Sequence, residues 1–599
     1  MTDDRKQIPE KYKWDLSKIY GSMDAFEADM EAVRDAISRA DEHRANMLSS
    51  ASGLLSLMDE LTGVNRIMSK LFSYASHGSD LDTSDNSFLA LVGRVRNLSN
   101  DFGEAYYFTD PMLISLDDET LNGWYESCPA LRAYERTIYK TRRYAPHSLG
   151  DDGERLMAQL SGGMGSHSSI RSILSNAEMK FGNIKGEDGK PIKLTEANFV
   201  ALEGSFDRRV RRSVFNRMYS RYGEFGNTYA ALMNAYVKEH CATSKARGYE
   251  SSLQASVFRD EVTPEIYNNL CDTVGANLDV LYDYYELKRE MLGVPKFHLY
   301  DVYTPLIASC EKKYTFEEAV EEVLDTVSIF GDEYHDVLEN GLKNDRWVDV
   351  YPSRGKRNGA YSSGSYDVAP YMLLNFTDTL DDVSTLAHEA GHSMHTYFSA
   401  KNNTPQDSRY TIFVAEVAST VNELLFAHRK LRESDSDDEK LSILNQTLDT
   451  YKGTLFRQTM FAEFERFMHV SCEEGKTLTR DFLCENYYNL VKRYFGPKVV
   501  CDEGIANEWM RIPHFYMWFY VYKYATCISA ASSIVKRIES EGEPYIKKYL
   551  EFLSCGGSKS PLDSLAVAGI DMTKPDVIED AVADFKDTLA MFKKLQGKA

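Results

Sequence analysis

Apolar residues recur at spacings of three and four along most of this chain, which is the period of an amphipathic helix. Few residues interrupt the pattern, since only 16 of the 599 residues are proline, and proline breaks helices more strongly than any other residue. Residues 25–61, with a polar break near Ala45, and residues 88–108 read as helices of this kind. We therefore expect a mainly α fold, and a chain of this length predicts roughly two or three packed units.

One stretch that departs from the helical pattern is residues 179–195. Two short alternating runs flank Asp188-Gly189, and an Asp-Gly pair in this setting is a hairpin turn signal. We expect a β-hairpin here and place a domain boundary directly after it. The predicted domains are an N-terminal helical lobe, residues 1–195, and a larger domain, residues 196–599, which carries the motifs described below.

A second departure is residues 347–376, which are rich in glycine and proline and end in a short apolar run. The run 371–376 reads as a short strand. A helix follows it, and Thr377 or Asp378 is the expected N-cap, because short polar side chains accept hydrogen bonds from the first free N–H groups of a helix.

The charge balance excludes two classes of partner. The chain carries 69 basic and 91 acidic residues, for a net charge of −22. A general nucleic-acid binder needs clustered lysine and arginine, so we expect no nucleic acid as a partner. Docking on anionic lipid needs the same charge, and no run reaches the roughly 18 apolar residues of a membrane helix, so we expect no membrane contact either.

The cysteines bear on location and on the kind of metal site. They are scattered, their number is odd, and no two form a C-x-x-C pair, which argues against a disulfide framework and against a thiolate zinc site. We expect mostly buried, reduced thiols and a cytoplasmic protein. The first fourteen residues agree, because they lack the apolar core of a secretory signal. The nine cysteines are Cys128, Cys241, Cys271, Cys310, Cys472, Cys484, Cys501, Cys527 and Cys555.

The residues that decide the function are His388-Glu389-Ala390-Gly391-His392, an H-E-x-x-H motif. On a helix, side chains four residues apart lie on one face, so the two imidazoles can bind one Zn²⁺. The glutamate beside the first histidine can reach a zinc-bound water. The alternative is a helix with two unrelated histidines, and the discovery of a third ligand would exclude it.

A catalytic zinc needs a third protein ligand and an open fourth position. The extended pattern H-E-x-x-H-x-x-G-x-x-H is absent, because His395 stands where it needs glycine. Glu416 lies 24 residues after His392 within an apolar, small-residue run, and a carboxylate there is costly to bury unless it is paired or metal-bound. We expect it to be the third ligand, with a buried ion pair as the alternative.

Two further residues are candidates for an outer shell around the zinc ligands. Glu423 lies on the same helical face as Glu416 and could hold a ligand histidine, although glutamates are also common on surfaces. His395 is on the same helix as the two motif histidines and reads as a core or outer-shell residue rather than a fourth ligand.

The expected chemistry is peptide hydrolysis. Zinc lowers the pKa of its bound water to about 7 and polarises the scissile carbonyl. Glu389 would take the proton from that water and deliver it to the leaving amine. The oxyanion that forms needs hydrogen-bond donors in addition to the metal.

Candidate donors occur in residues 511–525. Tyr516, Tyr520 and Tyr524 recur every four residues after His514, which predicts three phenols on one helical face, with Tyr522 off that face. An aromatic core helix is the alternative. Three hydroxyl groups on one face favour a polar cleft, because each buried hydroxyl needs a partner.

Together with other segments, these motifs resemble the oligoendopeptidase F branch of the thimet-type oligopeptidase family. H-E-x-x-H alone is shared by many families, whereas this ordered set through most of the chain is highly specific. The matching segments are Trp14-Asp15-Leu16-Ser17, Lys245-Ala246-Arg247-Gly248-Tyr249, His298-Leu299-Tyr300-Asp301, Gly359-Ala360-Tyr361-Ser362, residues 370–376, 388–392 and 413–420, His514-Phe515-Tyr516 and residues 520–526.

The resemblance implies two helical lobes around a deep substrate channel, with a small β-sheet next to the H-E-x-x-H helix. It implies a zinc metalloendopeptidase that cuts internal bonds of short oligopeptides and spares folded proteins, because the channel excludes bulk. By the family's pattern, His388, His392 and Glu416 correspond to the ligands of one zinc ion per chain and Glu389 to the catalytic base. Residues 196–599 would then be the catalytic domain.

The family's pattern also implies roles for the downstream aromatic residues. His514, Tyr520 and Tyr524 correspond to residues that bind substrate and stabilise the oxyanion. The stretch 359–376 looks like the loop and edge strand that receive the peptide backbone. The expected substrate-binding residues are Gly359, Tyr361, Tyr371 and Tyr516.

One departure from the family is visible, since Thr526 is followed by Cys527 where members usually have glycine. A side chain there could narrow a subsite, which leaves the substrate range open. Two other functions are compatible with parts of the pattern: a zinc hydrolase that acts on a non-peptide amide, and a non-catalytic helical protein that binds peptides. The sequence leaves open the cleavage preference, the oligomeric state and the physiological role.

Overall fold

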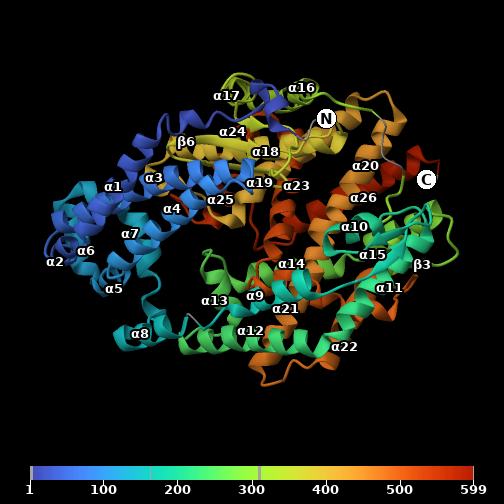
Figure 1. Cartoon of the computed structure of the whole chain (residues 1–599), viewed down its shortest axis with the longest axis horizontal. Helices are drawn as coiled ribbons and strands as arrows, with labels where there is room; N and C mark the ends of the chain where they lie inside the picture. The colour runs from blue at the N-terminus through green and yellow to red at the C-terminus, as the bar shows by residue number, and fades with distance from the viewer. Residues whose placement is uncertain (1–3, 162, 308–311, 598–599) are drawn as a thin grey trace. The chain divides into compact units, whose positions relative to one another are not determined.

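A computed structural model describes every residue except 1–3, 162, 308–311 and 598–599 (Figure 1). The fold is mainly helical, at 72%, with three small sheets among the described residues, which confirms the predicted mainly α class. Cys310 and the first three residues of the N-terminal segment lie outside the described residues.

The chain divides into two compact units, and each is built from three chain segments. Helices α19 (Ile412–Glu433) and α23 (Tyr522–Glu541) each contain a point at which the chain leaves one unit for the other. The predicted division into residues 1–195 and 196–599 stays a prediction. Unit 1 comprises Met1–Ser148, Lys312–Arg429 and Arg537–Gly569, and unit 2 comprises Leu149–Glu311, Lys430–Lys536 and Ile570–Ala599.

Unit 1 begins with long antiparallel helices whose apolar faces meet in a core. In α1, Phe26, Met30 and Val33 are buried at spacings of four and three, and they pack with Leu71 of α3 and Val95 of α4. Figure 1 shows these three helices in blue. The helices of unit 1 are α1 (Met23–Ser38), α2 (Ala40–Asn46), α3 (Ala51–Leu81), α4 (Asn86–Ala105), α5 (Thr109–Ser115), α6 (Asp118–Ser127), α7 (Glu135–Arg142), α16 (Phe316–Val327), α17 (Asp332–Lys343), α18 (Leu380–Asn402), α24 (Glu543–Leu553), α25 (Pro561–Val567) and most of α19.

These bounds confirm the helices expected in residues 25–61 and 88–108. The break expected near Ala45 is also confirmed, because α2 ends at Asn46 and α3 begins at Ala51. Ser50 caps α3 by accepting a hydrogen bond from the N–H of Gly53, and this explains where the third helix starts.

The sheet of unit 1 has three strands in the order β4 (Val348–Asp349), β6 (Val368–Leu373), β5 (Tyr361–Ser365). β4 runs parallel to β6 and β5 runs antiparallel to it. Helix α18 packs on both β5 and β6, so the small sheet next to the H-E-x-x-H helix is confirmed. The predicted strand at 371–376 is misplaced, since β6 begins three residues earlier and ends at Leu373.

The predicted N-cap of α18 is wrong. The capping residue is Thr379, whose hydroxyl accepts a hydrogen bond from the N–H of Asp382. The Asp382 carboxylate accepts hydrogen bonds from the backbone N–H groups of both Thr377 and Thr379, at 3.0 and 2.9 Å. This reciprocal capping box fixes the N-cap two residues beyond Thr377, and Asp378 takes a positive φ of 68°.

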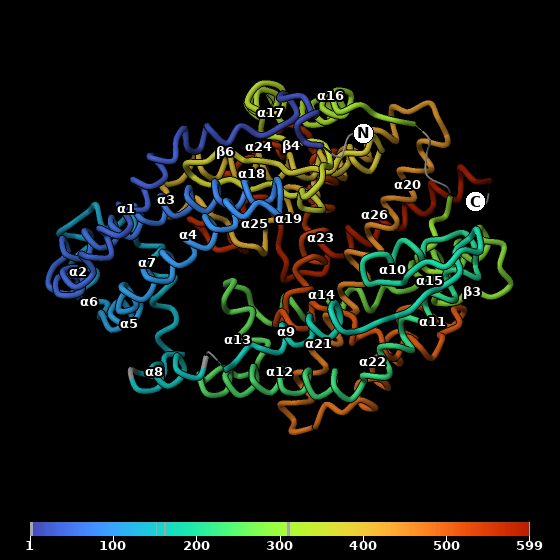
Figure 2. The backbone as a smooth tube through the Cα atoms, in the orientation of Figure 1, coloured from blue at the N-terminus to red at the C-terminus, as the bar shows by residue number. Residues whose placement is uncertain are grey.

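Unit 2 contains the predicted hairpin. β1 (Asn183–Lys185) pairs antiparallel with β2 (Pro191–Lys193), and Gly189 in the turn between them has a φ of +78°, a conformation that glycine adopts without strain. In Figure 2, α20 and α26 lie side by side although they are far apart in the sequence. The helices of unit 2 are α8 (Gly150–Ser161), α9 (Ser166–Ser172), α10 (Glu196–Glu203), α11 (Arg208–Glu224), α12 (Gly226–Ala246), α13 (Ser252–Phe258), α14 (Pro264–Ala276), α15 (Asp279–Met291), α20 (Asp437–Tyr451), α21 (Arg457–Glu473), α22 (Arg480–Phe495), α26 (Asp576–Leu595) and the first part of α23, and its other strands are β3 (Phe297–His298) and β7 (Val499–Val500).

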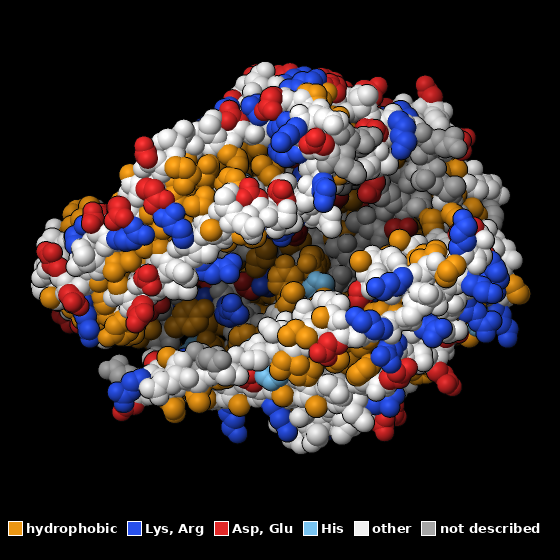
Figure 3. All heavy atoms as spheres, viewed as in Figure 1, with side chains coloured by type: hydrophobic (Ala, Val, Ile, Leu, Met, Phe, Trp, Pro, Cys, Tyr) orange, Lys and Arg blue, Asp and Glu red, His pale blue; other side chains and the backbone are white. Residues whose placement is uncertain are grey.

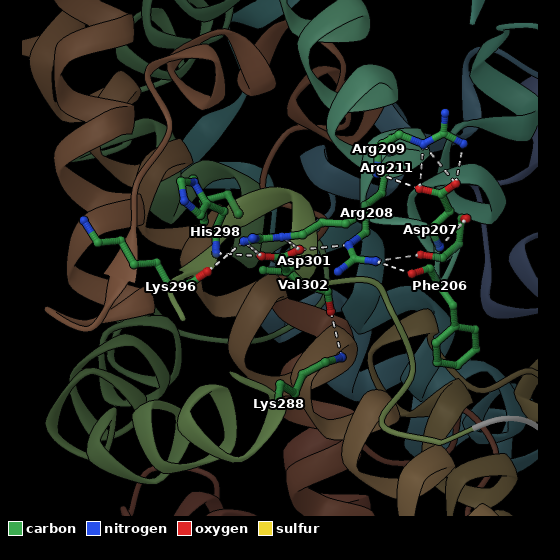
Figure 4. Close-up of polar contacts among 12 residues, drawn as sticks. Phe206, Asp207, Arg208, Arg209, Arg211, Lys288, Lys296, His298, Asp301 and Val302 are labelled. Carbon is green, nitrogen blue, oxygen red and sulfur yellow. Dashed lines mark hydrogen bonds and ion pairs between the residues drawn. The ribbon is translucent and has the colours of Figure 1, made fainter. Parts of the chain in front are cut away.

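Unit 2 also contains a buried ion-pair cluster around Asp301 (Figure 4). The Asp301 carboxylate is 0% exposed and accepts hydrogen bonds from the side chains of Arg208 and Arg211, each at a closest distance of 2.8 Å. The backbone N–H of His298 donates a further bond at 3.0 Å. We call these four residues the Asp301 cluster. Every charge in it has an opposite partner, which is the condition for burying a carboxylate.

The structure shows how charged side chains are distributed on the surface. Acidic and basic side chains are interspersed on the face drawn in Figure 3. Among the described helices, none has the length and apolarity that a membrane crossing requires.

The eight described cysteines are all free thiols, as predicted. The prediction that most are buried is wrong, because only Cys271, Cys527 and Cys555 are buried and the other five are partly exposed.

Candidate metal centre

The two motif histidines lie on one face of α18, as the sequence predicts. They are four positions apart in the sequence, so their side chains are about one turn apart. The Nε2 atoms of His388 and His392 are 3.1 Å from each other. Their rings meet nearly at right angles, with an interplanar angle of 81°, so both lone pairs can point at one atom.

Glu416 reaches these histidines because α18 and α19 approach closely at Gly391. A Cβ atom at this position would lie 2.5 Å from the carbonyl oxygen of Ala418 and 2.6 Å from the Cα of Ser419, which no larger residue tolerates. Only glycine fits, and the contact sets the spacing between the two helices. Asn422, which is 0% exposed, donates a hydrogen bond from α19 to the Ala387 carbonyl of α18 at 3.2 Å.

The three expected ligand atoms form a compact triangle. The Oε2 atom of Glu416 is 3.3 Å from the Nε2 atoms of both His388 and His392. Three donors that bind one zinc at about 2.0–2.1 Å in a tetrahedron lie about 3.3 Å from one another. The residues therefore fit a zinc ion with three protein ligands and a fourth position open. We call these three side chains the metal cluster.

The electrostatics of the metal cluster favour a positive charge. Burial lowers the pKa of His388, but the nearby carboxylates of Glu423 and Glu416 outweigh burial and raise that pKa well above its ordinary value. Burial raises the pKa of Glu416, and the hydrogen bonds with the two histidines reverse this and lower it below its ordinary value. A carboxylate among imidazoles attracts either a proton or a divalent cation.

Glu423 lies behind the first ligand, as expected. Its Oε2 atom is 3.2 Å from the Nδ1 atom of His388. An N–H that donates from Nδ1 to a carboxylate leaves Nε2 as the free lone pair, so this contact fixes the tautomer that a metal needs.

Glu389 is buried beside the metal cluster. It is 5% exposed, and its Oε2 atom has no hydrogen-bond partner among the described residues. Burial raises the pKa of this carboxyl, with smaller opposing effects from His388 and His392. A buried carboxyl oxygen without a partner is costly, and here it leaves an acceptor atom beside the metal cluster.

His395 does not join the metal cluster. It is 1% exposed and stacks on the ring of Tyr410 with centroids 3.6 Å apart, while Phe552 packs at 5.4 Å. Burial lowers its pKa to about 3, so the imidazole is neutral. One other group of potential metal donors exists among the described residues, His335, Asp336 and Glu339. Asp336 is 73% exposed, and an exposed group of this kind is common without a metal.

The prediction of three tyrosines on one helical face is wrong. Tyr516 belongs to the short 3₁₀ helix η12 (Pro513–Tyr516), and α23 begins only at Tyr522. Between them, Trp518 and Phe519 have positive φ angles of 45° and 57°, which break the helical period. No glycine or proline in 517–521 signals the break.

The structure nevertheless brings most of the predicted set together within unit 2. The rings of His514 and Tyr520 are stacked with centroids 6.4 Å apart, and Tyr524 lies 6.0 Å from His514 and 5.4 Å from Tyr520. All three side chains are partly exposed. We call them the His-Tyr set. Tyr516 is separate from it, since it is buried and packs on Tyr236 at 5.2 Å.

The predicted backbone-binding stretch forms the edge of the unit 1 sheet. β5 is one of the two outer strands, so one side of its backbone has no partner strand among the described residues. Gly359 precedes it with a φ of +86°. The side chains of Tyr361 and Tyr371 serve the fold: their hydroxyls donate to Asp80 at 2.7 Å and to the Asp15 carbonyl at 2.9 Å.

A cleft of about 960 Å³ opens beside this edge strand. Its walls come from β5, from α3 and from the turn that contains Arg409, all within unit 1. The lining is mixed, with Arg66, Arg357 and Asp367 among many small polar side chains. An unpaired strand edge beside an open cleft is the arrangement that an extended peptide can complete as an added strand.

Three residues that shape these sites were missed by the sequence reasoning: Gly391, Asn422 and Glu465. A glycine inside a helical motif signals a close approach. Asn422 and Glu465 are polar residues inside apolar runs, which is the same signal that identified Glu416. Glu465 is on α21 and accepts a hydrogen bond from the backbone N–H of Phe519 at 2.6 Å.

Comparisons with known proteins place these features in context. Residues 201–584 match the model of peptidase family M3, and residues 113–181 match that of oligopeptidase F. Oligopeptidase PepF of Bacillus subtilis is 37% identical over 592 residues, which cover 99% of this chain and 88% of that protein. A crystal structure of a Chlamydophila abortus protein superposes with a TM-score of 0.91 at 36% identity, covering 99% of this chain and 100% of the other. Oligoendopeptidase F from Enterococcus faecium gives a TM-score of 0.77 at 31% identity, covering 96% and 99%.

Proposed function

This chain belongs to peptidase family M3, and we propose that His388, His392 and Glu416 hold its zinc ion while Glu389 acts as the general base. The protein is a zinc metalloendopeptidase of the oligopeptidase F type that hydrolyses oligopeptides. The alternatives of a hydrolase for non-peptide amides and of a non-catalytic peptide binder do not fit this membership.

The observation that carries the proposal is the spacing of the metal cluster. Its three donor atoms are 3.1–3.3 Å apart, which matches three corners of a zinc tetrahedron. When bound, zinc supplies Lewis acidity that lowers the pKa of water and polarises a carbonyl oxygen.

Glu389 provides the proton transfer. Its unpartnered Oε2 atom can accept a proton from the attacking water and return it to the leaving amine. Its raised pKa suits this double role, because a base that must also act as an acid works best with a pKa near the working pH.

Glu423 and His395 have supporting roles in this proposal. Glu423 orients His388 through its Nδ1–H, and partners of this kind typically change metal affinity about 10–100-fold. His395 stabilises the packing of α18 through its stack on Tyr410.

For unit 2, we propose that the His-Tyr set binds substrate and supplies hydrogen bonds to the oxyanion. His514, Tyr520 and Tyr524 are partly exposed and cluster within one unit. One phenol or imidazole donor that acts only in the transition state is worth roughly 10²–10³ in kcat. Tyr516 stays a predicted substrate residue, although its burial favours a role in packing.

For the peptide backbone, we propose that it pairs with the free edge of β5, beginning near Gly359. Tyr361 lies on β5 and would contribute through its backbone atoms. Tyr371 lies on β6, the central strand, and would contribute by holding β5 in position. The two-lobed body around a deep channel, the cytoplasmic location and the absence of nucleic-acid partners stay predictions from the sequence and the resemblance. The oligomeric state is open.

The experiment is digestion of a mixture of peptides of about 4 to 30 residues, read by mass spectrometry, with the wild type and Glu389→Gln compared at equal zinc content. We expect internal cuts in short peptides by the wild type alone. Equal cleavage by both proteins would exclude Glu389 as the base, and no cleavage by either, with zinc bound, would contradict the peptidase function.

A further inference from the structure

The link between η12 and α23 is a strained piece of backbone. Trp518 and Phe519 are consecutive residues in the left-handed region, with φ angles of 45° and 57°. Neither is glycine, and a bulky aromatic side chain is a rare occupant of this region. Such conformations persist only where the surroundings over-determine them, and they cluster at functional sites. The next residue along the chain is Tyr520 of the His-Tyr set.

Side chains from two helices hold this link in place. Ser256 of α13 donates a hydrogen bond to the Trp518 carbonyl at 2.7 Å, and the Trp518 indole N–H donates to the Ser252 hydroxyl at 3.0 Å. On α21, the Glu465 carboxyl accepts the Phe519 N–H at 2.6 Å. The backbone of both strained residues is therefore fixed from outside the link.

Glu465 forms no ion pair with any residue that the structure describes. Glu465 is 0% exposed, its Oε2 atom has no partner among the described residues, and the Phe519 N–H is the group that lowers its pKa. Burial nevertheless raises that pKa to about 8. Glu508, an equally buried glutamate in the same unit, accepts hydrogen bonds from Arg457 at 2.6 Å and Tyr487 at 2.6 Å.

A buried carboxyl group without a counter-ion costs stability, and an apolar side chain would avoid that cost. The one interaction that an apolar residue could not replace is the acceptor for the Phe519 N–H. That hydrogen bond fixes the backbone one residue before Tyr520.

We infer that Glu465 is a positioning residue, which holds the strained Trp518–Phe519 link so that Tyr520 stacks on His514 and meets Tyr524. This inference rests on the proposed function of the His-Tyr set. Because the link interrupts the helical period, the three rings could not meet without it: on one continuous helix, His514 and Tyr520 would be six residues apart and on different faces. Glu465 acts through Tyr520 and does not itself touch substrate.

The test is a double-mutant cycle on kcat with zinc content matched. Glu465→Met removes the acceptor at similar volume, and Glu465→Gln keeps it as the matched control. We expect Glu465→Met to lower kcat by about tenfold with KM changed less than about twofold, since misplacement of a transition-state donor affects kcat. Glu465→Gln should stay within about twofold of the wild type.

The second arm uses Tyr520→Phe in both backgrounds. If Glu465 acts through Tyr520, the loss from Tyr520→Phe should be about tenfold smaller in the Glu465→Met background than in the wild type. Losses that simply multiply would overturn the inference. Should Glu465→Met fail to fold, Ser256→Ala removes the bond to the Trp518 carbonyl and is expected to give a smaller loss with the same coupling.

Hydrogen exchange of residues 517–521 gives a readout that does not depend on catalysis. We expect protection to fall in Glu465→Met and to be kept in Glu465→Gln, and unchanged protection in both would overturn the inference. A Tyr520→Phe variant with wild-type kcat would contradict the proposed role of Tyr520 instead, and the exchange comparison would still decide whether Glu465 holds the link.

Discussion

The metal cluster of unit 1 and the Asp301 cluster of unit 2 both pair a carboxylate with nitrogen-bearing side chains, but the partners differ. Glu416 is 32% exposed in the first, and Asp301 is 0% exposed in the second. Asp301 is bound by Arg208 and Arg211, so its charge is balanced by the protein. Among the described residues, the ion-pair partners of Glu416 and Glu423 are imidazoles alone. Arginine is always charged, whereas an imidazole can be neutral and offer a lone pair. A carboxylate paired with arginines is complete as it stands, and one paired with imidazoles leaves a place for a cation.

The largest expected effect is on zinc content and activity, and it should be confined to the metal cluster. His392→Ala should lower zinc content and reduce kcat/KM by about 10³-fold or more, because zinc contributes several kcal/mol and 1.36 kcal/mol is tenfold. Metal analysis and peptide assays measure both. The control is His335→Ala, in the exposed group on α17, which should keep zinc and activity. Unchanged zinc content in His392→Ala would contradict the metal cluster as the zinc site.

The second prediction addresses stability in unit 2. Asp301→Asn removes the negative charge between Arg208 and Arg211, and breaking a buried pair costs about 3–5 kcal/mol. Denaturant titration should show this loss, while zinc content per folded chain should be unchanged. Zinc loss equal to that of His392→Ala would show that the two clusters are not independent.

The third prediction concerns the close contact between α18 and α19 at Gly391. Gly391→Ala places a Cβ within 2.6 Å of the α19 backbone, and overpacking of this kind costs about 1–3 kcal/mol. The helices must separate, so zinc affinity should weaken together with stability. Gly93→Ala in α4 is the matched control, because a Cβ there meets nothing within 4 Å, and it should stabilise by about 0.5–1 kcal/mol. Unchanged zinc affinity in Gly391→Ala would contradict the role of this contact.

The fourth prediction concerns the pH dependence of stability and the buried lysine beside the Asp301 cluster. Lys288 is 0% exposed and donates to the Val302 carbonyl at 2.8 Å (Figure 4). Burial lowers its pKa from 10.5 to about 7, with Lys452 and Arg211 adding to this and Asp449 opposing it. Between these pH values the unfolded chain binds more protons than the folded one, so this group makes stability rise with pH.

Lys288→Met removes that contribution. We expect the free energy of unfolding to rise less steeply between about pH 7 and 10 in the variant than in the wild type, measured by urea titration at each pH. If the free energy of unfolding rises equally steeply with pH in both proteins, Lys288 keeps its ordinary pKa in the fold. Its positive charge would then be balanced by nearby carboxylates, as the arginines of the Asp301 cluster are.

The parts of this molecule that the sequence predicts well depend on local rules. The spacing of His388 and His392 predicts that they share one face of α18, because helical periodicity acts within a few turns. The apolar run around Glu416 singled out the carboxylate that the structure places beside them, although its side chain is 32% exposed. The Asp188-Gly189 hairpin also follows from a local rule.

The predictions that failed concern residues whose conformation depends on tertiary contacts. The helical period from Tyr516 to Tyr524 is regular in the sequence, but Trp518 and Phe519 are held in the left-handed region by Glu465 and Ser256, which lie far away along the chain. Tertiary packing overrides local propensity at such sites. The Thr379 cap was missed because three adjacent residues can each cap a helix, and the Asp382 carboxylate decides between them.

X-ray absorption at the zinc edge of the purified wild-type protein identifies the atoms that bind the metal. The account predicts a first shell of two imidazole nitrogens and carboxylate oxygen at about 2.0–2.2 Å, with one imidazole lost in His392→Ala. A shell with sulfur at about 2.3 Å, or a spectrum that His392→Ala leaves unchanged, would contradict the metal cluster as the zinc site.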